Sequence, residues 1–481
     1  MKTIPVGDCI WEIPASEKPG MLVPARIYAS ERLLAQMDRG VFEQVTNVAC
    51  LPGIVRAALC MPDGHWGYGF PIGGVAAFRA DGGVISPGGI GFDINCGMRV
   101  LRTTLSEAEV RPRLTELVEA LFAAVPSGVG AKGFVRLSED EFREVTREGS
   151  RWCVRHGYGW PEDLAATEAG GCLAGADPSH VSARAVSRGK DQLGTLGSGN
   201  HYLEIQVVPP DGIHDPEVAR ALGISEPGQI LIMLHCGSRG FGHQVGTDYL
   251  RTFDQVMKTY GITVRDRELA CAPFRSREGQ AYFGAMNAAA NTAFANRQVI
   301  THRVREVMGR VFGRDPRELG LSVIYDVCHN TAKLERHVVE GESVDLVVHR
   351  KGATRSFGPG APDVPEAYRA IGQPVIIGGS METGSALLVG TAHAMQETFG
   401  STAHGAGRTM SRTQAKRQVW GETLMKDMQA RGIIIRAASK SGVAEEAGFA
   451  YKSLTEVVDV VHRLDISRRV VSLAPIGNIK G

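Results

Sequence analysis

The segment Pro87–Arg99 reads PGGIGFDINCGMR and places an acid and a thiol, Asp93 and Cys96, three residues apart among four glycines. Glycine has no Cβ atom, so the backbone here can turn tightly or approach a ligand closely. A carboxylate and a thiolate at this spacing can converge on one divalent metal, and a thiolate favours Mn, Fe, Co or Zn over Mg or Ca. An isolated D-x-x-C is more simply a buried structural cysteine in a turn. The metal interpretation gains weight from histidines that recur downstream in similar settings.

The composition is that of an ordinary globular enzyme. Of the 481 residues, 43% are hydrophobic and 22% are charged, and no linker or internal repeat divides the chain. We expect one domain over residues 1–481. Its strands and helices are interspersed without strict βαβ alternation, which favours a mixed α+β fold over a doubly wound sheet. The net charge of only +1 means that a nucleic-acid partner would need a local basic surface.

Cysteine usage and apolar runs indicate the compartment. The nine cysteines include no CxxC pair, which argues against a disulfide scaffold or a zinc ribbon and favours a reducing cytoplasm. The first residues, MKTIPVGDCIWEIP, lack the apolar region of a signal peptide. No apolar run approaches the ~20 residues that a membrane helix needs. We therefore expect a cytoplasmic protein with no membrane partner.

Several expected strands end in polar residues and enter Gly-rich turns. His235 follows the strand 230–234, Cys328-His329-Asn330 follows 321–327, and Gly378–Met381 follows 374–377. A fourth strand, 201–208, begins with a histidine. Reactive groups at strand ends on a rigid scaffold are a common way to build an active site. Helices are expected over residues 30–47, 111–125, 278–312, with an interruption at Gly284, and 454–464.

A metal centre is the first candidate site. The candidate ligands all lie beside Gly, Asn or Cys at turn-like positions; they are Asp93, Cys96, His201, His235 and His329. This set exceeds the needs of one tetrahedral ion, so a two-metal site with a bridging Cys96 fits better. Any one of the histidines alone is more simply a core residue. Four others without such a setting are taken as structural: His65, His156, His214 and His462.

The segment Ser401–Arg412, STAHGAGRTMSR, is the second candidate. His404 has no bulky neighbour and could accept a phosphoryl or nucleotidyl group. Backbone N–H groups of the Gly-rich turn, with a helix starting near Thr409, could cradle a phosphate, and Arg408 and Arg412 could act as phosphate forks one turn apart. The alternatives are a Gly-rich helix start with solvated arginines, or an oxyanion-hole turn, which HGAG also resembles.

Weaker signals lie elsewhere. Gly378–Ser385, GGSMETGS, and Lys480 near the C-terminus could help to hold a nucleotide, but neither matches a P-loop. Basic residues cluster at His349-Arg350-Lys351 with Arg355, and such clusters are solvated faces by default. Beside a phosphate-handling site they could instead form a groove for an RNA backbone. The residues we expect to contact RNA are Arg239, Lys351, Arg408 and Arg412.

In this order, the motifs resemble the RtcB family of GTP-dependent RNA-splicing ligases, over about residues 20–481. The segments that carry the resemblance are MPDGHWGYGFPIGG (61–74), FDINCGMR (92–99), LGTLGSGNHYLEIQ (193–206), HCGSRGFGHQ (235–244), DVCHNTAK (326–333), HRKGATR (349–355), VIIGGSM (375–381), HGAGRTMSR (404–412) and PIGNIKG (475–481).

The resemblance implies a single large α+β domain of the RtcB type. It implies that the chain joins RNA 2′,3′-cyclic phosphate or 3′-phosphate ends to 5′-hydroxyl ends, in tRNA splicing or RNA repair, using GTP and two manganese ions, and that an archease-type activator can assist. The five candidate ligands fall on the family's manganese ligands, with Cys96 bridging, and His404 falls on the guanylylated histidine. The guanylate site maps to Asn200, His201, Tyr202, Leu203, Glu204, His329, Asn330, Gly378, Gly379, Ser380, Met381, Ser385, His404, Gly405, Ala406, Gly407, Tyr451 and Lys480.

This sequence departs from the family pattern at a few positions. Cys236 stands where Ser or Thr is expected, Glu382 where Gly is usual, Ala386 where an aromatic residue is common, and Asn478-Ile479 precede the terminal lysine. None of them removes a metal ligand or His404, so they bear on guanine fit and RNA preference.

Two other functions are considered: a catalytically weak RNA-binding paralogue that keeps the metal site, and a metal-dependent phosphoesterase. Neither needs a nucleotidyl-accepting histidine, so the intact surroundings of His404 argue against both.

Overall fold

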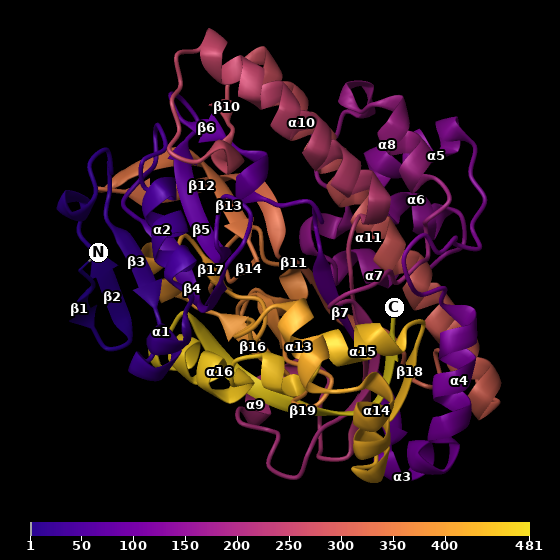
Figure 1. Cartoon of the computed structure of the whole chain (residues 1–481). Helices are drawn as coiled ribbons and strands as arrows, with labels where there is room; N and C mark the ends of the chain where they lie inside the picture. The colour runs from indigo at the N-terminus through magenta and orange to yellow at the C-terminus, as the bar shows by residue number, and fades with distance from the viewer. Residues whose placement is uncertain (1) are drawn as a thin grey trace.

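The computed structural model describes residues 2–481 and shows two large β-sheets with helices around them, which confirms the expected mixed α+β fold (Figure 1). One sheet has seven strands, in the order β1 (Ile4–Gly7), β2 (Ile10–Ile13), β3 (Ala25–Tyr28), β4 (Ala58–His65), β5 (Ile72–Arg79), β13 (Glu342–Lys351) and β12 (Asn330–Val339). The other has eight strands, in the order β11 (Ser322–Cys328), β7 (Gly97–Ser106), β9 (Gln229–Cys236), β8 (Tyr202–Val207), β19 (Ser467–Lys480), β16 (Ser385–Gly390) and β15 (Pro374–Gly378), with β18 (Ile434–Ala437) paired to β19. Two short ladders pair β6 (Val84–Ile85) with β10 (Ala272–Pro273) and β14 (Ala353–Arg355) with β17 (Ser401–Ala403).

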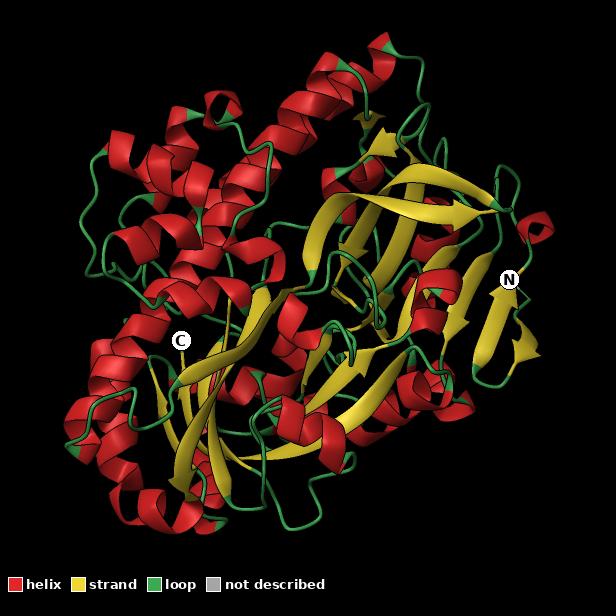
Figure 2. Cartoon of the chain, turned by 180° about the vertical axis from the view of Figure 1, so that it is seen from behind, coloured by secondary structure: helices red, strands yellow, loops and turns green. Residues whose placement is uncertain are grey.

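The two longest helices and several short ones lie on one side of the strands, and the remaining helices lie along the other edges, as the rear view shows (Figure 2). They are α1 (Glu31–Gln36), α2 (Arg39–Val48), α3 (Glu107–Val110), α4 (Leu114–Ala124), α5 (Glu139–Glu148), α6 (Ser150–Arg155), α7 (Pro161–Ala165), α8 (Ala183–Gly189), α9 (Pro216–Ala221), α10 (Arg239–Thr259), α11 (Arg277–Phe312), α12 (Ala392–Glu397), α13 (Arg412–Gln418), α14 (Gly421–Ala430), α15 (Lys440–Glu445) and α16 (Leu454–Arg463). None of the helices in residues 2–481 is both long and apolar enough to cross a bilayer.

Helix α11 is the central helix of the molecule, 36 residues long and buried along most of its length. Ser276 caps its start by accepting a hydrogen bond from the Gly279 N–H, and Gly313 ends it in the left-handed conformation at φ 65°. The expected interruption at Gly284 is wrong. The helix continues there because Gly284 packs against a loop, where an added Cβ would lie 3.0 Å from the Cβ of Asp177.

Other expected helices and strands are present, but their first or last residues differ from those predicted. The helix expected over residues 30–47 is two helices, because the chain leaves the helical conformation at Met37 and Asp38. The helix expected from residue 111 begins with a 3-10 turn and becomes α4 at Leu114, and it buries Leu114, Leu117, Val118 and Leu121. The final segment is one long strand, β19, so Lys480 is a strand residue.

Strand register places the candidate ligands together. In the eight-stranded sheet β11, β7, β9 and β8 are antiparallel neighbours, and Gly97 pairs with both Cys236 and Cys328, while Tyr202 pairs with His235. Because neighbours run in opposite directions, the starts of β7 and β8 lie beside the ends of β9 and β11. All four ends therefore meet at one edge. His329 links β11 directly to β12, which belongs to the other sheet.

Candidate active site

The five candidate ligands converge at this edge, which we call the floor. The Cys96 Sγ lies 3.3 Å from His201 Nε2 and 3.2 Å from His235 Nε2. His235 Nε2 lies 3.1 Å from His329 Nε2, and His201 Nε2 lies 2.8 Å from Asp93 Oδ2. Two candidate metal groups result, Cys96–His235–His329 and Asp93–Cys96–His201, and they share Cys96. His235 lies inside β9 rather than after it, where the sequence predicts it.

The protonation states of the floor suit a metal. Burial lowers the pKa values of His235 and His329 well below the ordinary value, so both rings are neutral and present lone pairs. Burial opposes ionisation of Asp93, yet His201 and Arg239 nearby hold the pKa of this carboxyl below its usual range. Burial raises the pKa of the Cys96 thiol, so a bound cation would have to displace its proton. Buried neutral imidazoles with a thiol and a carboxylate are a donor set for a softer divalent ion.

His404 lies beside this floor, directly after β17 of the two-stranded ladder. Its ring centroid lies 4.7 Å from that of His329. Its Nδ1 lies 2.6 Å from Oδ2 of Asp63, a fully buried residue of β4, and the same oxygen accepts the backbone N–H groups of His404 and Gly405 at 3.3 Å each. Asp63 thus contacts Nδ1 of the ring and does not contact Nε2. No sequence spacing points to Asp63, because 341 residues separate it from His404.

The turn after His404 is fixed by backbone contacts to two strands. The Gly378 N–H donates to the His404 carbonyl at 3.2 Å, and the Ala406 N–H donates to the Gly378 carbonyl at 2.9 Å. Gly407 has φ 75°, and a Cβ there would lie 2.1 Å from the backbone oxygen of Asp63. Only glycine fits at such an approach. The Gly-rich turn is therefore held against both β15 and β4.

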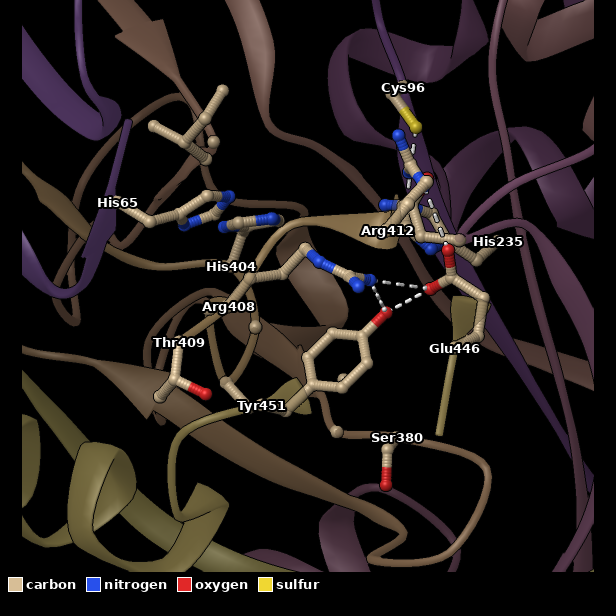
Figure 3. A pocket seen from close by; sticks show the side chains of 18 of the residues that line it. His65, Cys96, His235, Ser380, His404, Arg408, Thr409, Arg412, Glu446 and Tyr451 are labelled. Atoms are coloured by element: carbon tan, nitrogen blue, oxygen red, sulfur yellow. Dashed lines mark hydrogen bonds and ion pairs between the residues drawn. The ribbon is translucent and has the colours of Figure 1, made fainter. Parts of the chain in front are cut away.

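One cavity of about 1030 Å³ opens over the floor and His404 (Figure 3). Most of the expected guanylate residues line it: Asn200, Tyr202, His329, Asn330, Gly378, Gly379, Ser380, Met381, His404, Gly405, Ala406, Gly407, Tyr451 and Lys480. Four expected residues are not among the lining. His201 lies in the floor, and Leu203 packs in the core on the other face of β8. Glu204 and Ser385 lie behind the lining, joined through Gln206.

Another side of the cavity, which we call the wall, is formed by the residues from Arg408 to Gln414 together with Glu446 and Tyr451. Arg408 Nη1 lies 3.2 Å from Glu446 Oε2 and 3.1 Å from the Tyr451 hydroxyl, and Arg412 Nε lies 3.0 Å from Glu446 Oε1 (Figure 3). Burial opposes ionisation of Glu446, but Lys480 and the two arginines hold its pKa at about 2. The expected helix start near Thr409 is wrong: α13 begins at Arg412 after a Ser411 cap, so the arginines are not one helical turn apart. They are instead joined through one carboxylate.

The expected solvated patch around residues 349–355 is wrong. His349, Arg350, Lys351 and Arg355 are all buried. Arg350 pairs with Glu335, and the Lys351 ammonium donates to the carbonyls of Tyr68 and Gly88. Burial lowers the pKa of Lys351 to about 7. The polar residues here mainly hold strands together, because charged groups buried between strands need partners.

Arg239 lies beside the floor itself. Its Nη1 lies 3.0 Å from His201 Nδ1, and the residue itself has φ 55° at the start of α10. Lys480 lies at the far side, 3.4 Å from the Gly199 carbonyl oxygen, with its ammonium 5.7 Å from the Tyr202 ring centroid. Burial lowers the pKa of Lys480, while Glu446 and Glu204 oppose that change.

The departures from the family pattern are accommodated locally. The Cys236 thiol accepts a hydrogen bond from Asn296 Nδ2 at 3.4 Å. Glu382 accepts the Gly448 N–H at 2.6 Å and pairs with Arg431 at 2.8 Å, so it fastens the GGSM loop to the segments that carry these two residues. Ala386 is buried in β16.

Four residues of the site are not predicted from the sequence: Asp63, His65, Trp66 and Glu446. His65 lines the cavity instead of serving only the core, and Trp66 lies at its rim with 67% of its surface exposed. Asp63, His65 and Trp66 all lie in or beside β4, within MPDGHWGYGFPIGG. The density of polar and aromatic residues among its glycines is the signal that could have found them. Glu446 has no such signal, because the two arginines with which it pairs lie 34 and 38 residues away.

Comparison with known proteins identifies the family. The family model described as tRNA-splicing ligase RtcB matches residues 44–481. A tRNA-splicing ligase RtcB of Archaeoglobus fulgidus is 53% identical over 99% of this chain and 98% of its own, and one of Thermococcus kodakarensis is 54% identical over 98% and 97%. RNA-splicing ligase RtcB homolog 1 of Entamoeba histolytica is 50% identical over 91% and 83%. The chain therefore belongs to the RtcB family.

Proposed function

We propose that this RtcB-family chain acts as one catalytic domain that joins RNA 2′,3′-cyclic phosphate or 3′-phosphate ends to 5′-hydroxyl ends with GTP. tRNA halves or broken RNAs in the cytoplasm are its substrates, and an archease-type protein can assist it. The observation that carries the proposal is the position of His404. Its ring is held by a buried carboxylate on one side and faces a cluster of metal-binding groups on the other.

Asp63 prepares His404 for attack on phosphorus. A carboxylate next to Nδ1 keeps the proton on that nitrogen, which leaves the lone pair on Nε2. In the proposed step the Nε2 lone pair attacks the α-phosphorus of GTP, a nitrogen–phosphorus bond forms, and the bond to the β-phosphate oxygen breaks to release pyrophosphate. The ring becomes cationic on attack, and the adjacent Asp63 carboxylate stabilises that charge.

The guanylate then passes to the RNA. A 2′,3′-cyclic phosphate is first opened by water, which breaks the bond from phosphorus to O2′ and leaves a 3′-phosphate. The terminal 3′-phosphate oxygen attacks the same phosphorus of the guanylate and His404 leaves, which gives an RNA 3′-end activated by GMP. The 5′-hydroxyl of the second RNA attacks the 3′-phosphorus, and GMP departs. The Gly405 and Ala406 N–H groups already donate to Asp63 and to the Gly378 carbonyl, so the phosphate oxygens would rely on cationic side chains of the cavity, among them the buried Lys480.

The floor supports a role for manganese. Cys96, His235 and His329 would hold one ion, and Asp93, Cys96 and His201 the other. Bound ions would supply positive charge beside the phosphates. The protein contributes the geometry and the protonation state of the ligands: β-sheet register positions them, and burial keeps His235 and His329 neutral.

Labelling with GTP tests the proposal. The wild-type protein is incubated with Mn²⁺ and GTP labelled at the α-phosphate, then separated by denaturing electrophoresis. We expect a labelled band that is stable to alkali and lost in acid, as for a nitrogen–phosphorus bond, and no label from γ-labelled GTP. Addition of RNA with a 3′-phosphate should discharge the band.

The Asp63→Asn variant tests the assigned tautomer. Its amide can donate to Nδ1 and so favour the tautomer that carries the proton on Nε2. We expect labelling to fall by about two orders of magnitude or more. The control is Asp81→Asn, which changes an exposed carboxylate after β5 that pairs with Arg275. Absence of any label on the metal-loaded wild-type protein would contradict the proposed function.

A further inference from the structure

Arg297 makes an unusually complete set of contacts beneath the floor. It lies on α11 with no exposed surface. Its Nε and Nη2 donate to Asp326 at 2.8 and 2.9 Å, its Nη1 donates to the carbonyls of Asn95 and Cys236 at 2.9 Å each, and its Nη2 also donates to Asn95 Oδ1 at 3.1 Å. A guanidinium has five N–H donors in a fixed planar fork. Every one of them is used.

The acceptors lie on the three segments that carry one candidate metal group. The predicted ligand beside each acceptor is Cys96 for Asn95, His235 for Cys236 and, three residues along the chain, His329 for Asp326. Asn95 has φ 52°, a conformation that costs energy in a non-glycine residue and needs support. Its side-chain amide donates to the Ala290 carbonyl of α11 at 2.6 Å, so the helix holds this turn at a second point.

A buried ion pair by itself is weak evidence of function. Arg305 provides the comparison, since it lies on the same helix, is 3% exposed and forms a bidentate pair with Asp163 at 2.7 Å. It also donates to the Leu321 carbonyl at 3.0 Å, and neither partner adjoins a candidate ligand. Arg297 differs in that one rigid group joins all three ligand-bearing segments.

We propose that Arg297 is a positioning residue that sets the separation of Cys96, His235 and His329 and thereby the affinity of this group for a divalent ion. The inference rests on the metal site of the proposed function. A lysine at this position keeps the positive charge for Asp326 but has a single point of donation, so it cannot span the three segments.

Cobalt binding tests the proposal without reference to activity. Co²⁺ titration, followed by calorimetry and by the thiolate-to-metal absorption band, is compared for wild type, Arg297→Lys and Arg305→Lys. Substitution of groups that orient metal ligands typically costs about 10- to 100-fold in affinity. We expect that decrease at the Cys96–His235–His329 group in Arg297→Lys, with a smaller one at the group that shares only Cys96 and with an altered absorption band, and wild-type binding in Arg305→Lys.

Each other outcome has a defined meaning. Wild-type affinity and spectrum in Arg297→Lys would overturn the proposal, as would an equal decrease in Arg305→Lys. If Arg297→Lys does not fold, Asn95→Gly removes one acceptor of the fork and accepts φ 52° without strain; it should show a smaller decrease in affinity, and unchanged binding would overturn the proposal. A wild-type protein that binds no cobalt would instead contradict the metal site of the proposed function.

A second, independent observation concerns Trp66 at the cavity rim. Its indole is 67% exposed and lines the same cavity as His404. One ring face rests on α2, where a Cβ added at Gly40 would lie 3.3 Å from indole Cδ2. The next residue is fixed by Gln44, whose amide donates to the Gly67 carbonyl at 2.6 Å and accepts the Gly67 N–H at 3.2 Å.

Trp66 is therefore an aromatic surface presented on fixed backbone, three residues after the carboxylate that holds His404. We infer that it stacks on a nucleobase of the RNA end that enters the cavity. This inference rests on the proposed function and adds a subsite to it. Every base has an apolar face, so such stacking tolerates any sequence and suits an enzyme that must accept many RNA ends.

RNA binding tests the subsite. Dye-labelled RNA ending in a 3′-phosphate is titrated by anisotropy with wild type, Trp66→Ala, Trp66→Phe and Trp420→Ala, the last changing a side chain that is 84% exposed and absent from the cavity lining. We expect about a ten-fold decrease in affinity for Trp66→Ala, near-complete retention for Trp66→Phe and no change for Trp420→Ala. The decrease should vanish on RNA that lacks bases in its last nucleotides. Equal binding by Trp66→Ala, or an equal decrease on base-free RNA, would overturn the subsite, whereas absence of GTP labelling in wild type would overturn the proposed function.

Discussion

The floor and the wall of the cavity are held by different forces. In the floor, the ligands are positioned by the register of four antiparallel strands and by Arg297 beneath them. In the wall, Arg408, Arg412 and Tyr451 are positioned by one carboxylate, Glu446. Backbone pairing fixes a geometry, whereas ion pairs at a cavity surface can be exchanged for other anions. The comparison suggests that the floor is built to stay constant and the wall to exchange Glu446 for phosphate.

The strongest test of a constant floor is Cys96→Ala. The thiol belongs to both candidate metal groups, so its removal should abolish binding at both positions while the sheet remains folded. Metal content after gel filtration in Mn²⁺ measures this result, and circular dichroism checks the fold. Retention of two tightly held ions would show that Cys96 does not bridge.

The next test removes the residue between floor and wall. His404→Ala should abolish both the GTP-derived label and the joining of a 3′-phosphate end. It should still join RNA that already carries the activated 3′-guanylate, because that substrate needs only the floor and the RNA contacts. Gel assays with the two substrates measure the difference. Failure on activated RNA by folded, metal-loaded protein would assign His404 a further role.

The two regions also differ in how far sequence predicts them. Three floor ligands were predictable because His201, His235 and His329 each adjoin an expected apolar strand, and Asp93 and Cys96 were indicated by their spacing among glycines. The antiparallel pairing of β7 with β9, which brings Cys96 and His235 together, was not predicted. In the wall, Arg408, Arg412 and Tyr451 were expected at the site, but Glu446 was not, since its pairing with the two arginines follows from tertiary packing. The predicted helix interruption at Gly284 was wrong for a related reason. A glycine inside a helical pattern indicates a break, but here the missing side chain lets the helix pack closely against Asp177.

Lys480→Ala should impair guanylate loading and leave the floor intact. The ammonium is buried at the cavity near Glu446 and Glu204. Removal of one charge-assisted hydrogen bond, about 1.5–3 kcal/mol, corresponds to about a 10- to 100-fold decrease in GTP affinity. Labelling at a series of GTP concentrations measures it, with metal content as the control. Unchanged loading would remove Lys480 from the guanylate site.

Exchange at the wall is tested with the arginine variants. Arg408→Ala and Arg412→Ala should weaken RNA binding by several-fold and reduce the slope of affinity against salt by about one for each phosphate that the protein no longer neutralises. Glu446→Gln should act in the opposite direction on the slope, because the arginines lose their internal partner. Anisotropy titrations at several salt concentrations supply the slopes. An unaltered slope in the double arginine variant would contradict the exchange.

The smallest expected effect is on stability at acidic pH, and it compares one buried carboxylate near the floor, Glu168, with one in the wall, Glu446. Burial opposes ionisation of Glu168, yet Lys333 and Arg355 hold its pKa at about 2 beneath the floor, where it also accepts the Cys328 N–H; Glu446 in the wall has a pKa of about 2 as well. A lowered folded pKa stabilises the protein above the unfolded value of about 4.5, and this stability is lost as the pH falls toward 2. Between pH 7 and pH 4 each carboxylate should therefore account for a decrease of about 1 kcal/mol in the free energy of unfolding.

Urea unfolding at both pH values measures this contribution. Glu168→Gln and Glu446→Gln should each lack that part of the wild-type pH dependence. Only Glu168→Gln should also weaken Co²⁺ binding, because Glu168 contacts the strand end that carries His329. Equal effects of the two variants on metal binding would mean that the wall is coupled to the floor as tightly as the floor's own supports.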